Sequence, residues 1–270
     1  MRLPHYRRFF IGLFLIIMFA ALWLAQVFEL TTSAARYLWA HDYRAAAYYL
    51  NNTDGDLAFQ MGQYYFGGGA YDLDKAAKSY QLALEQQPGM LWGHYQRARI
   101  YFVQGKFEKA LQEIEAELEA NPANLRSLYV RGLIYLSADD LFAAEADFKA
   151  FVAWAPTEWG GYNDLAFVLA KEGKYAESEV VIMEAMQKVP NAKDIPWLWN
   201  SLGLAQLNRL HYTDAAASFA KALALAEGVT AEDWRRAYSG NNPQGDEDGV
   251  HQFRQTIEKN LRSAQLRGTL

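Results

Sequence analysis

Few side chains in this sequence have the spacing that catalysis or metal binding requires. No two of its five histidines are four residues apart, the separation that would place two imidazoles on one helix face around a zinc ion. The histidines are His5, His41, His94, His211 and His251. The chain has no cysteine, which excludes disulfides, thiolate zinc sites and cysteine nucleophiles. We therefore expect no metal site.

Glycines and carboxylates offer two further patterns to consider. The triplet GGG at 67–69 is not followed by Lys-Ser or Lys-Thr, so a phosphate-binding loop is a weaker interpretation than a long turn. Neighbouring acids such as Asp139 and Asp140, or Glu113 and Glu115, fall in helical or turn segments without an enclosing apolar pocket. Solvated surface charge explains them better than acid–base chemistry. We expect no cofactor and no enzymatic activity.

Composition indicates an all-α protein and argues against nucleic acid as a partner. The sequence is 51% apolar with only seven prolines, which favours a helical chain with a substantial core. The formal charge of −5 becomes −8 over residues 9–270, because Arg2, Arg7 and Arg8 precede them. An acidic body without a basic stripe repels phosphate backbones.

The segment FFIGLFLIIMFAALWLAQVF, residues 9–28, predicts a transmembrane helix. Its only strongly polar residue is Gln26. At about 1.5 Å per residue it spans roughly 30 Å, the thickness of a bilayer's hydrocarbon core. The arginines ahead of it favour a cytoplasmic N-terminus, so the remaining chain is expected to be periplasmic or extracellular.

A cleavable signal peptide is the alternative interpretation of this segment. The apolar region of a signal peptide is usually about 7–15 residues long and ends at a small-x-small cleavage site. Here the best such site, TSAA at 32–35, lies well beyond the apolar run. We favour a retained signal-anchor, although a cleaved leader would leave a soluble exported protein.

Beyond this segment the sequence repeats with a period of 34. Prolines mark the period at Pro88, Pro122, Pro156 and Pro190. Small and aromatic residues recur with them, as in Gly132, Tyr135, Ala144 and Phe148. A fixed period of this length is typical of stacked helical repeats, in which each unit buries its apolar face only against its neighbours.

The repeat resembles the tetratricopeptide (TPR) family, whose pattern is W-x2-L-G-x2-Y, A-x3-F and a terminal P. The clearest copy carries Trp199, Leu202, Gly203, Ala215, Phe219 and Ala222. Gln206 stands where the family has tyrosine. The resemblance implies a right-handed helix-turn-helix solenoid, in which small residues let neighbouring helices approach closely.

The repeat pattern divides the chain into five parts. We predict a basic flank over 1–8, the membrane helix over 9–28, a degenerate repeat or connecting helix over 29–55, five repeats over 56–226, and C-terminal capping helices and tail over 227–270.

The last of these parts contains two predicted helices. Thr230 is expected to cap the first, and residues 241–249 read as a polar connector. After the connector, Val250, Phe253 and Ile257 share one face of an amphipathic helix that would cover the last exposed repeat.

In the TPR family, the first helix of each repeat lines a concave groove. The family's groove positions correspond here to Trp92, Tyr95, Arg99, Phe102, Tyr129, Leu133, Asn163, Phe167, Asn200 and Leu204. These residues are largely apolar and aromatic, and the family's Lys and Asn clamp for a C-terminal carboxylate is missing. Such a lining suits an apolar helix or extended segment of a partner protein. The C-terminal helix covering part of the groove is the competing interpretation.

The sequence thus predicts a membrane-anchored scaffold that binds a protein or peptide in its groove and organises a complex at the outer face of the membrane. Its non-protein partner would be the lipid bilayer, through residues 9–28. The alternatives are a solenoid that self-associates as a structural module, and a cleaved, soluble exported adaptor.

Overall fold

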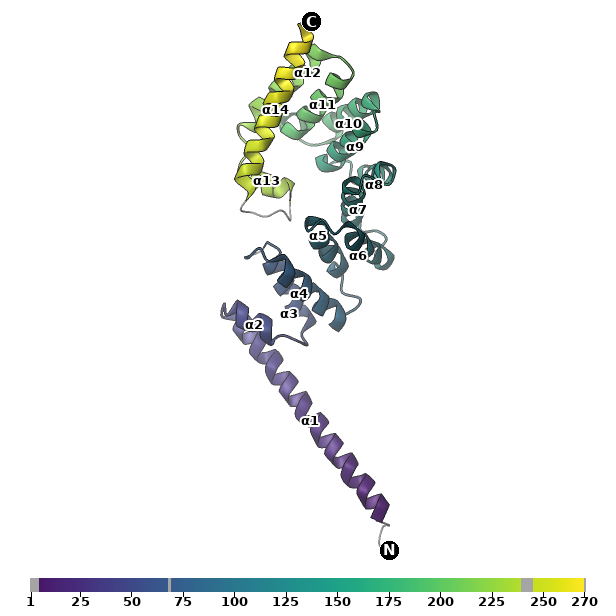
Figure 1. Ribbon diagram of the computed structural model, residues 1–270, viewed down its shortest axis with the longest axis vertical. Coiled ribbons are helices and arrows are strands. Elements are labelled where there is room, and N and C mark those ends of the chain that lie inside the picture. Colours follow the sequence, from purple (N-terminus) through teal and green to yellow (C-terminus); the bar gives the residue numbers. More distant parts are fainter. Residues whose placement is uncertain (1–4, 68, 239–244, 270) are drawn as a thin grey trace. The chain divides into compact units, whose positions relative to one another are not determined.

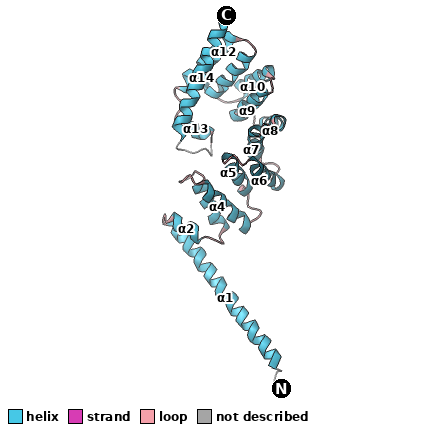
Figure 2. Ribbon diagram, viewed as in Figure 1, coloured by secondary structure: helices cyan, strands magenta, loops and turns pink. Residues whose placement is uncertain are grey.

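The computed structural model describes residues 5–67, 69–238 and 245–269, and in them all regular secondary structure is helical (Figure 2). This confirms the predicted all-α class. The helices are α1 His5–Ala40, α2 Arg44–Leu50, α3 Gly55–Tyr65, α4 Leu73–Gln86, α5 Gly93–Val103, α6 Phe107–Ala120, α7 Leu125–Ser137, α8 Leu141–Trp154, α9 Trp159–Lys171, α10 Tyr175–Lys188, the 3₁₀ turn η1 Ala192–Asp194, α11 Pro196–Asn208, α12 Tyr212–Ala226, α13 Ala231–Ala237 and α14 Asp246–Gly268.

The chain divides into two compact units. The first contains residues up to 65 together with 72–93, and the second contains residues 66–71 and those from 94 onwards. The first unit therefore holds α1–α4. The second holds the helices from α5 to α14, and it contains all the predicted groove residues except Trp92.

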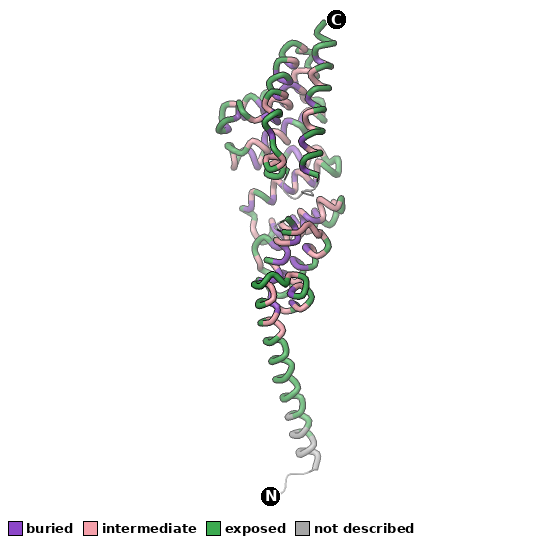
Figure 3. The backbone as a smooth tube through the Cα atoms, turned by 90° about the vertical axis from the view of Figure 1, so that its left-hand side faces the viewer, coloured by how far each residue is buried: buried purple, intermediate pink, exposed green. Residues whose placement is uncertain are grey.

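Helix α1 is a single uninterrupted helix, and its described residues up to Leu30, most of them apolar, are exposed (Figure 3). Within Ile16–Ala40 an 18-residue window has a mean hydropathy of 1.5, and none of this window is buried. In the described part of the chain this is the one helix long and apolar enough to cross a membrane, a test that a signal sequence also passes. The basic flank falls on residues 1–4, which lie outside the described residues, and on residues 5–8, whose side chains do.

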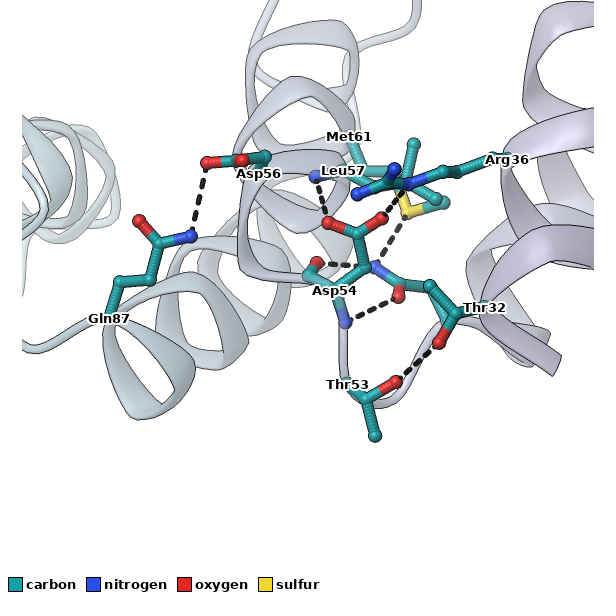
Figure 4. A network of polar contacts seen from close by, with 9 residues as sticks. Thr32, Arg36, Thr53, Asp54, Asp56, Leu57, Met61 and Gln87 are labelled. Atoms are coloured by element: carbon teal, nitrogen blue, oxygen red, sulfur yellow. Dashed lines mark hydrogen bonds and ion pairs between the residues drawn. The ribbon is translucent and has the colours of Figure 1, made fainter. Parts of the chain in front are cut away.

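A polar junction ties the end of α1 to the start of α3 (Figure 4). The guanidinium of Arg36 pairs with the carboxylate of Asp54, whose side chain is only 4% exposed. The other oxygen of Asp54 accepts a hydrogen bond from the backbone N–H of Leu57 at 3.1 Å, which caps α3. One turn earlier on α1, Thr32 bonds Thr53 at 2.7 Å. The chain therefore passes from α1 into the first hairpin through fixed contacts.

The helices from α3 to α12 form successive antiparallel hairpins, α3/α4 to α11/α12 (Figure 1). In three of them a glycine on the first helix faces an aromatic ring on the second. A Cβ on Gly62, Gly132 or Gly203 would come within 2.7 to 2.8 Å of a ring atom of Tyr80, Phe148 or Phe219. Close approach of the two helices thus requires these glycines.

The other two hairpins solve the same packing problem with different residues. Where the first helix carries alanine, at Ala98 and Ala166, the second carries isoleucine, at Ile114 and Ile182. Both isoleucines are fully buried, as are the rings of the glycine-containing hairpins. Glycine therefore occurs with a ring and alanine with a branched aliphatic side chain, which keeps the combined volume at the crossing nearly constant.

The C-terminal helices cover the last hairpin. Val250 and Ile257 of α14 are buried and Phe253 is partly buried, as the amphipathic pattern predicts. Thr230 caps α13 in a capping box with Asp233, which confirms its predicted role.

The prediction of a connector over 241–249 is wrong for its last residues. Its residues 241–244 lie outside the described residues, but Asp246–Gly249 already form the first turn of α14. Three consecutive acids, Asp246, Glu247 and Asp248, stabilise a helix N-terminus through the helix dipole. Asp246 also pairs with Arg235 of α13 at 2.7 Å.

Candidate interaction groove

The predicted groove residues of the second unit lie on the first helices of consecutive hairpins. We call α5, α7, α9 and α11 the inner column. Tyr95, Arg99 and Phe102 are on α5, Tyr129 and Leu133 on α7, Asn163 and Phe167 on α9, and Asn200 and Leu204 on α11. Trp92 precedes α5 and belongs to the first unit.

These residues differ widely in exposure. Phe167 is 47% exposed, whereas Tyr95 is only 9% exposed and packs in the core between α5, α6 and α7. Leu133 packs against a buried cluster formed by residues from α8 to α11, and Leu204 packs against a second cluster formed by α12 and α14. The guanidinium carbon of Arg99 lies 4.8 Å from the centroid of the Phe66 ring. Phe167 is therefore the most exposed large apolar side chain in the described part of the inner column.

A chain of hydrogen bonds connects α7, α9 and α11 across this column. The hydroxyl of Tyr129 donates to Asp164 at 2.6 Å, and the amide of Asn163 donates to the other oxygen of Asp164 at 3.1 Å. The hydroxyl of Ser201 then donates to the side-chain oxygen of Asn163 at 2.8 Å. Asn163 is thus engaged within the column, whereas the side-chain oxygen of Asn200 is buried and makes no hydrogen bond in the described chain.

The environment of Asp164 disfavours its charge. Burial raises the pKa of Asp164 to about 6, even though the hydrogen bonds from Tyr129 and Asn163 favour the charged form. Burial and the nearby Asp164 carboxylate likewise raise the pKa of Tyr129 well above its ordinary value. Burial and, to a smaller extent, the same carboxylate raise the pKa of Tyr238, on the turn after α13, to about 12.

Aromatic rings from four helices surround the start of α11. The ring of Trp197 is stacked between Trp159 and Phe253, with centroid distances of 5.1 and 5.2 Å. The indole N–H of Trp197 donates to the hydroxyl of Tyr238 at 3.0 Å, and Tyr238 packs on Trp234 at 4.3 Å. The helices α13 and α14 therefore cover Trp197, which is 9% exposed, and leave Phe167 open.

Sequence reasoning missed Asp164, and the repeat pattern gives little signal for it. Asp164 stands one period of 34 residues after Val130, which is buried and apolar. Three extra residues precede the next repeat, in which the same position is Ser201, a polar residue. The neighbouring repeats therefore do not mark this position as apolar. Tyr238 carries no repeat signal, because it lies outside the repeats.

The described side chains offer no arrangement for metal binding. Among the residues 5–67, 69–238 and 245–269, no group of three or more His, Cys, Asp or Glu lies close enough together to hold a metal ion. A shallow depression on the second helices is lined by Val180, Met183 and Arg209, and its apolar part is open to solvent.

Comparisons of sequence identify distant repeat proteins. No family model matches the chain. It is 26% identical over 159 residues to the TPR repeat-containing protein PA4667 of Pseudomonas aeruginosa, covering 56% of this chain and 25% of that protein. It is 32% identical over 77 residues to the tetratricopeptide repeat and J domain-containing co-chaperone DNJ1 of Cryptococcus neoformans, covering 28% of this chain and 15% of that protein. The chain thus spans a quarter or less of the length of these relatives.

Solved structures show the same architecture. MamA residues 41 to the end from Desulfovibrio magneticus superposes with a TM-score of 0.57 at 17% identity, covering 64% of this chain and 95% of that one. YrrB, described as a TPR protein with an unusual peptide-binding site, superposes with a TM-score of 0.53 at 17% identity, covering 68% and 93%. Together with the 34-residue period and the glycine–ring crossings, these likenesses show that the chain is built of TPR-type repeats with the TPR solenoid fold.

Proposed function

We propose that this protein is an interaction scaffold, anchored in a membrane by α1, that binds a segment of a partner protein along its inner column. The fold supports this, because TPR solenoids present extended surfaces to other chains. YrrB shares the fold and is described as having a peptide-binding site. The repeats would lie on the outer side of the membrane and have no catalytic role.

The observation that carries the proposal is the exposure of Phe167. The ring is 47% exposed on a helix whose buried neighbours Leu165, Ala166 and Val168 are at most 4% exposed. An open aromatic side chain in a groove position is the kind of anchor that a partner segment buries. The side-chain amide of Asn163 and the hydroxyl of Ser201 lie on the same column.

Site-specific photocrosslinking tests this proposal. The full-length chain carrying p-benzoylphenylalanine at Phe167 is irradiated in its native membrane, and crosslinked proteins are identified. Val180 on α10 is a matched control, because it is 65% exposed on a second helix. We expect a crosslink to one discrete partner protein from position 167 and no crosslink to it from position 180. Equal crosslinking at both positions contradicts binding along the inner column.

Self-association is the second candidate function, and the depression beside Val180 and Met183 favours it. Both side chains are largely exposed, at 65% and 47%. Exposed apolar groups on the outer helices suit a contact between copies of the chain. A crosslink from position 180 to a second copy would support assembly instead of recruitment.

Cysteine labelling tests the anchor and its orientation, since the chain has no cysteine of its own. Val180→Cys should react with a membrane-impermeant maleimide in intact spheroplasts, whereas His5→Cys should react only after permeabilisation. The reverse pattern contradicts the proposed topology. Recovery of the repeats in the soluble fraction without α1 supports a cleaved leader.

A further inference from the structure

Unlike most buried acids of the described chain, the partly exposed Asp164 has no cationic partner for its carboxylate. Asp54, Asp147 and Asp246 each pair with an arginine, and Glu145 pairs with two lysines. Glu117 has no cation but accepts hydrogen bonds from Asn124 and from the backbone of Tyr95. Asp164 receives hydrogen bonds only from the neutral groups of Tyr129 and Asn163 in the described chain.

Asp164 is placed where a ligand in the inner column can reach its carboxylate. Asp164 is partly exposed, and Phe167 follows it by three residues, which places both on the same side of α9. A ligand that covers the Phe167 ring therefore passes next to the carboxylate. The protein around the carboxylate excludes much of the solvent, so solvent screens the attraction of a cation there less than on an open surface.

The aromatic residues around Asp164 suit a cation that is flat or carries an aliphatic stem. Tyr129 packs on Phe151 at 5.0 Å and presents its hydroxyl to the carboxylate. A second phenol, that of Tyr238, accepts a hydrogen bond from Trp197 of α11 at 3.0 Å and is 37% exposed. Ring faces attract guanidinium and ammonium groups, and arginine pairs with carboxylates through two parallel hydrogen bonds.

We propose that Asp164 is the recognition site for a basic side chain, an arginine or lysine, of a partner segment bound along the inner column. This inference rests on the proposed function and narrows it, since it names the chemistry of the segment. The expected ligand pairs a basic residue with an apolar residue that covers Phe167. Such a segment differs from the acidic chain end that a Lys and Asn clamp would select.

A pair of small probes tests the site directly. N-acetylarginine methylamide and its neutral isostere N-acetylcitrulline methylamide are titrated into the full-length protein in detergent micelles. Indole N–H signals are followed by NMR, because the Trp197 N–H bonds Tyr238 and reports on this region. Trp197→Phe assigns the signal. We expect the Trp197 signal to shift with the arginine probe and not with citrulline.

Two variants decide whether Asp164 is responsible. Asp164→Asn removes the charge and preserves the shape of the side chain. We expect it to lower the affinity for the arginine probe at least about tenfold, the usual effect of losing a charged hydrogen-bond partner. Asp214→Asn removes an exposed acid from α12 and should leave binding unchanged. Equal binding of arginine and citrulline, or undiminished binding by Asp164→Asn, overturns the inference. An unchanged indole spectrum of the free variant shows that it is folded.

The inference and the proposed function fail in different ways. A partner captured at Phe167 with the same yield from the wild type and from Asp164→Asn overturns the basic-residue inference and keeps the scaffold function. Arginine binding that requires Asp164, with no partner captured at Phe167, keeps the acidic site and overturns the scaffold function.

Discussion

The hydroxyl of Tyr129 on α7 donates a hydrogen bond of 2.6 Å to the carboxylate of Asp164 on α9, so one polar contact joins the inner helices of consecutive repeats. The carboxylate occupies a position that is Val130 in the preceding repeat and Ser201 in the following one, both uncharged residues. Its presence lowers the stability of the solenoid near neutral pH, because its charge is poorly solvated there. Functional sites commonly carry a stability cost of this kind.

Asp164→Asn should stabilise the protein at neutral pH. The folded-state pKa of about 6 lies above the ordinary value of 3.8, so the folded state holds its proton more tightly than the unfolded state. The stabilising contribution of this proton is complete below about pH 4 and is lost as the pH rises through 6. We expect the variant to gain about 1 to 3 kcal/mol at pH 7.5. Thermal unfolding measures this, and the gain should vanish near pH 4, with Asp214→Asn as the control.

Glu145 should give the opposite dependence on pH. Hydrogen bonds from Lys149 of its own helix and from Lys174 at the α9–α10 turn lower the pKa of Glu145 to about 2. Its stabilising contribution is therefore present above about pH 4.5 and lost as the pH falls towards 2. Glu145→Gln should cost about 1 to 2 kcal/mol at pH 7 and little at pH 2, measured by thermal unfolding. An equal loss at both pH values contradicts this role.

The glycine–ring crossings predict a rescue experiment. Gly203→Ala should destabilise the protein by about 1 to 3 kcal/mol, because the new methyl group would lie 2.7 Å from the Phe219 ring. Adding Phe219→Ile reproduces the alanine–isoleucine pair of another hairpin and should restore part of the loss. Gly89→Ala is the control, since nothing lies within 4 Å of its added Cβ. Additive losses in the double variant would refute volume compensation.

At the junction of α1 and α3, Asp54 should matter more than Arg36. Asp54→Ala removes the ion pair and also the cap of α3, a loss of about 1 to 2 kcal/mol for the cap alone. Arg36 is 63% exposed, so Arg36→Ala should cost much less. Hydrogen exchange of the Leu57 amide reports on the cap and should accelerate mainly in Asp54→Ala. Lys78→Ala on the exposed side of α4 serves as the control, and similar effects of both junction variants contradict the cap.

The sequence predicts most of the fold because the repeat is regular. Pro122 and Pro156 mark the turns, and small residues such as Gly132 and Gly203 mark the helix crossings, since both obey local rules. The groove is less predictable, because exposure depends on neighbouring repeats. Tyr95 and Phe167 hold family groove positions, yet one is buried and the other open.

The region around Trp197 shows the other limit of prediction. Its burial depends on α13 and α14, which lie outside the repeat and approach it only in the folded chain. No periodicity relates Trp197 to Tyr238, 41 residues away, although they share a hydrogen bond. Contacts of this type follow from tertiary packing, which the repeat pattern does not encode.

In a chain anchored in a membrane by α1, the continuity of this helix would make the first hairpin, α3/α4, sensitive to the thickness of the bilayer. Its 36 residues extend for about 54 Å, well beyond the hydrocarbon core of about 30 Å. A transmembrane helix adapts to a thinner or thicker bilayer by changing its tilt. In an anchored chain, α1 has no break before Ala40 and Arg36 is paired with Asp54, so a change of tilt would reach α3 as a rotation. In such a chain, a mismatch between the length of α1 and the thickness of the bilayer would exert a force on the first hairpin of the solenoid.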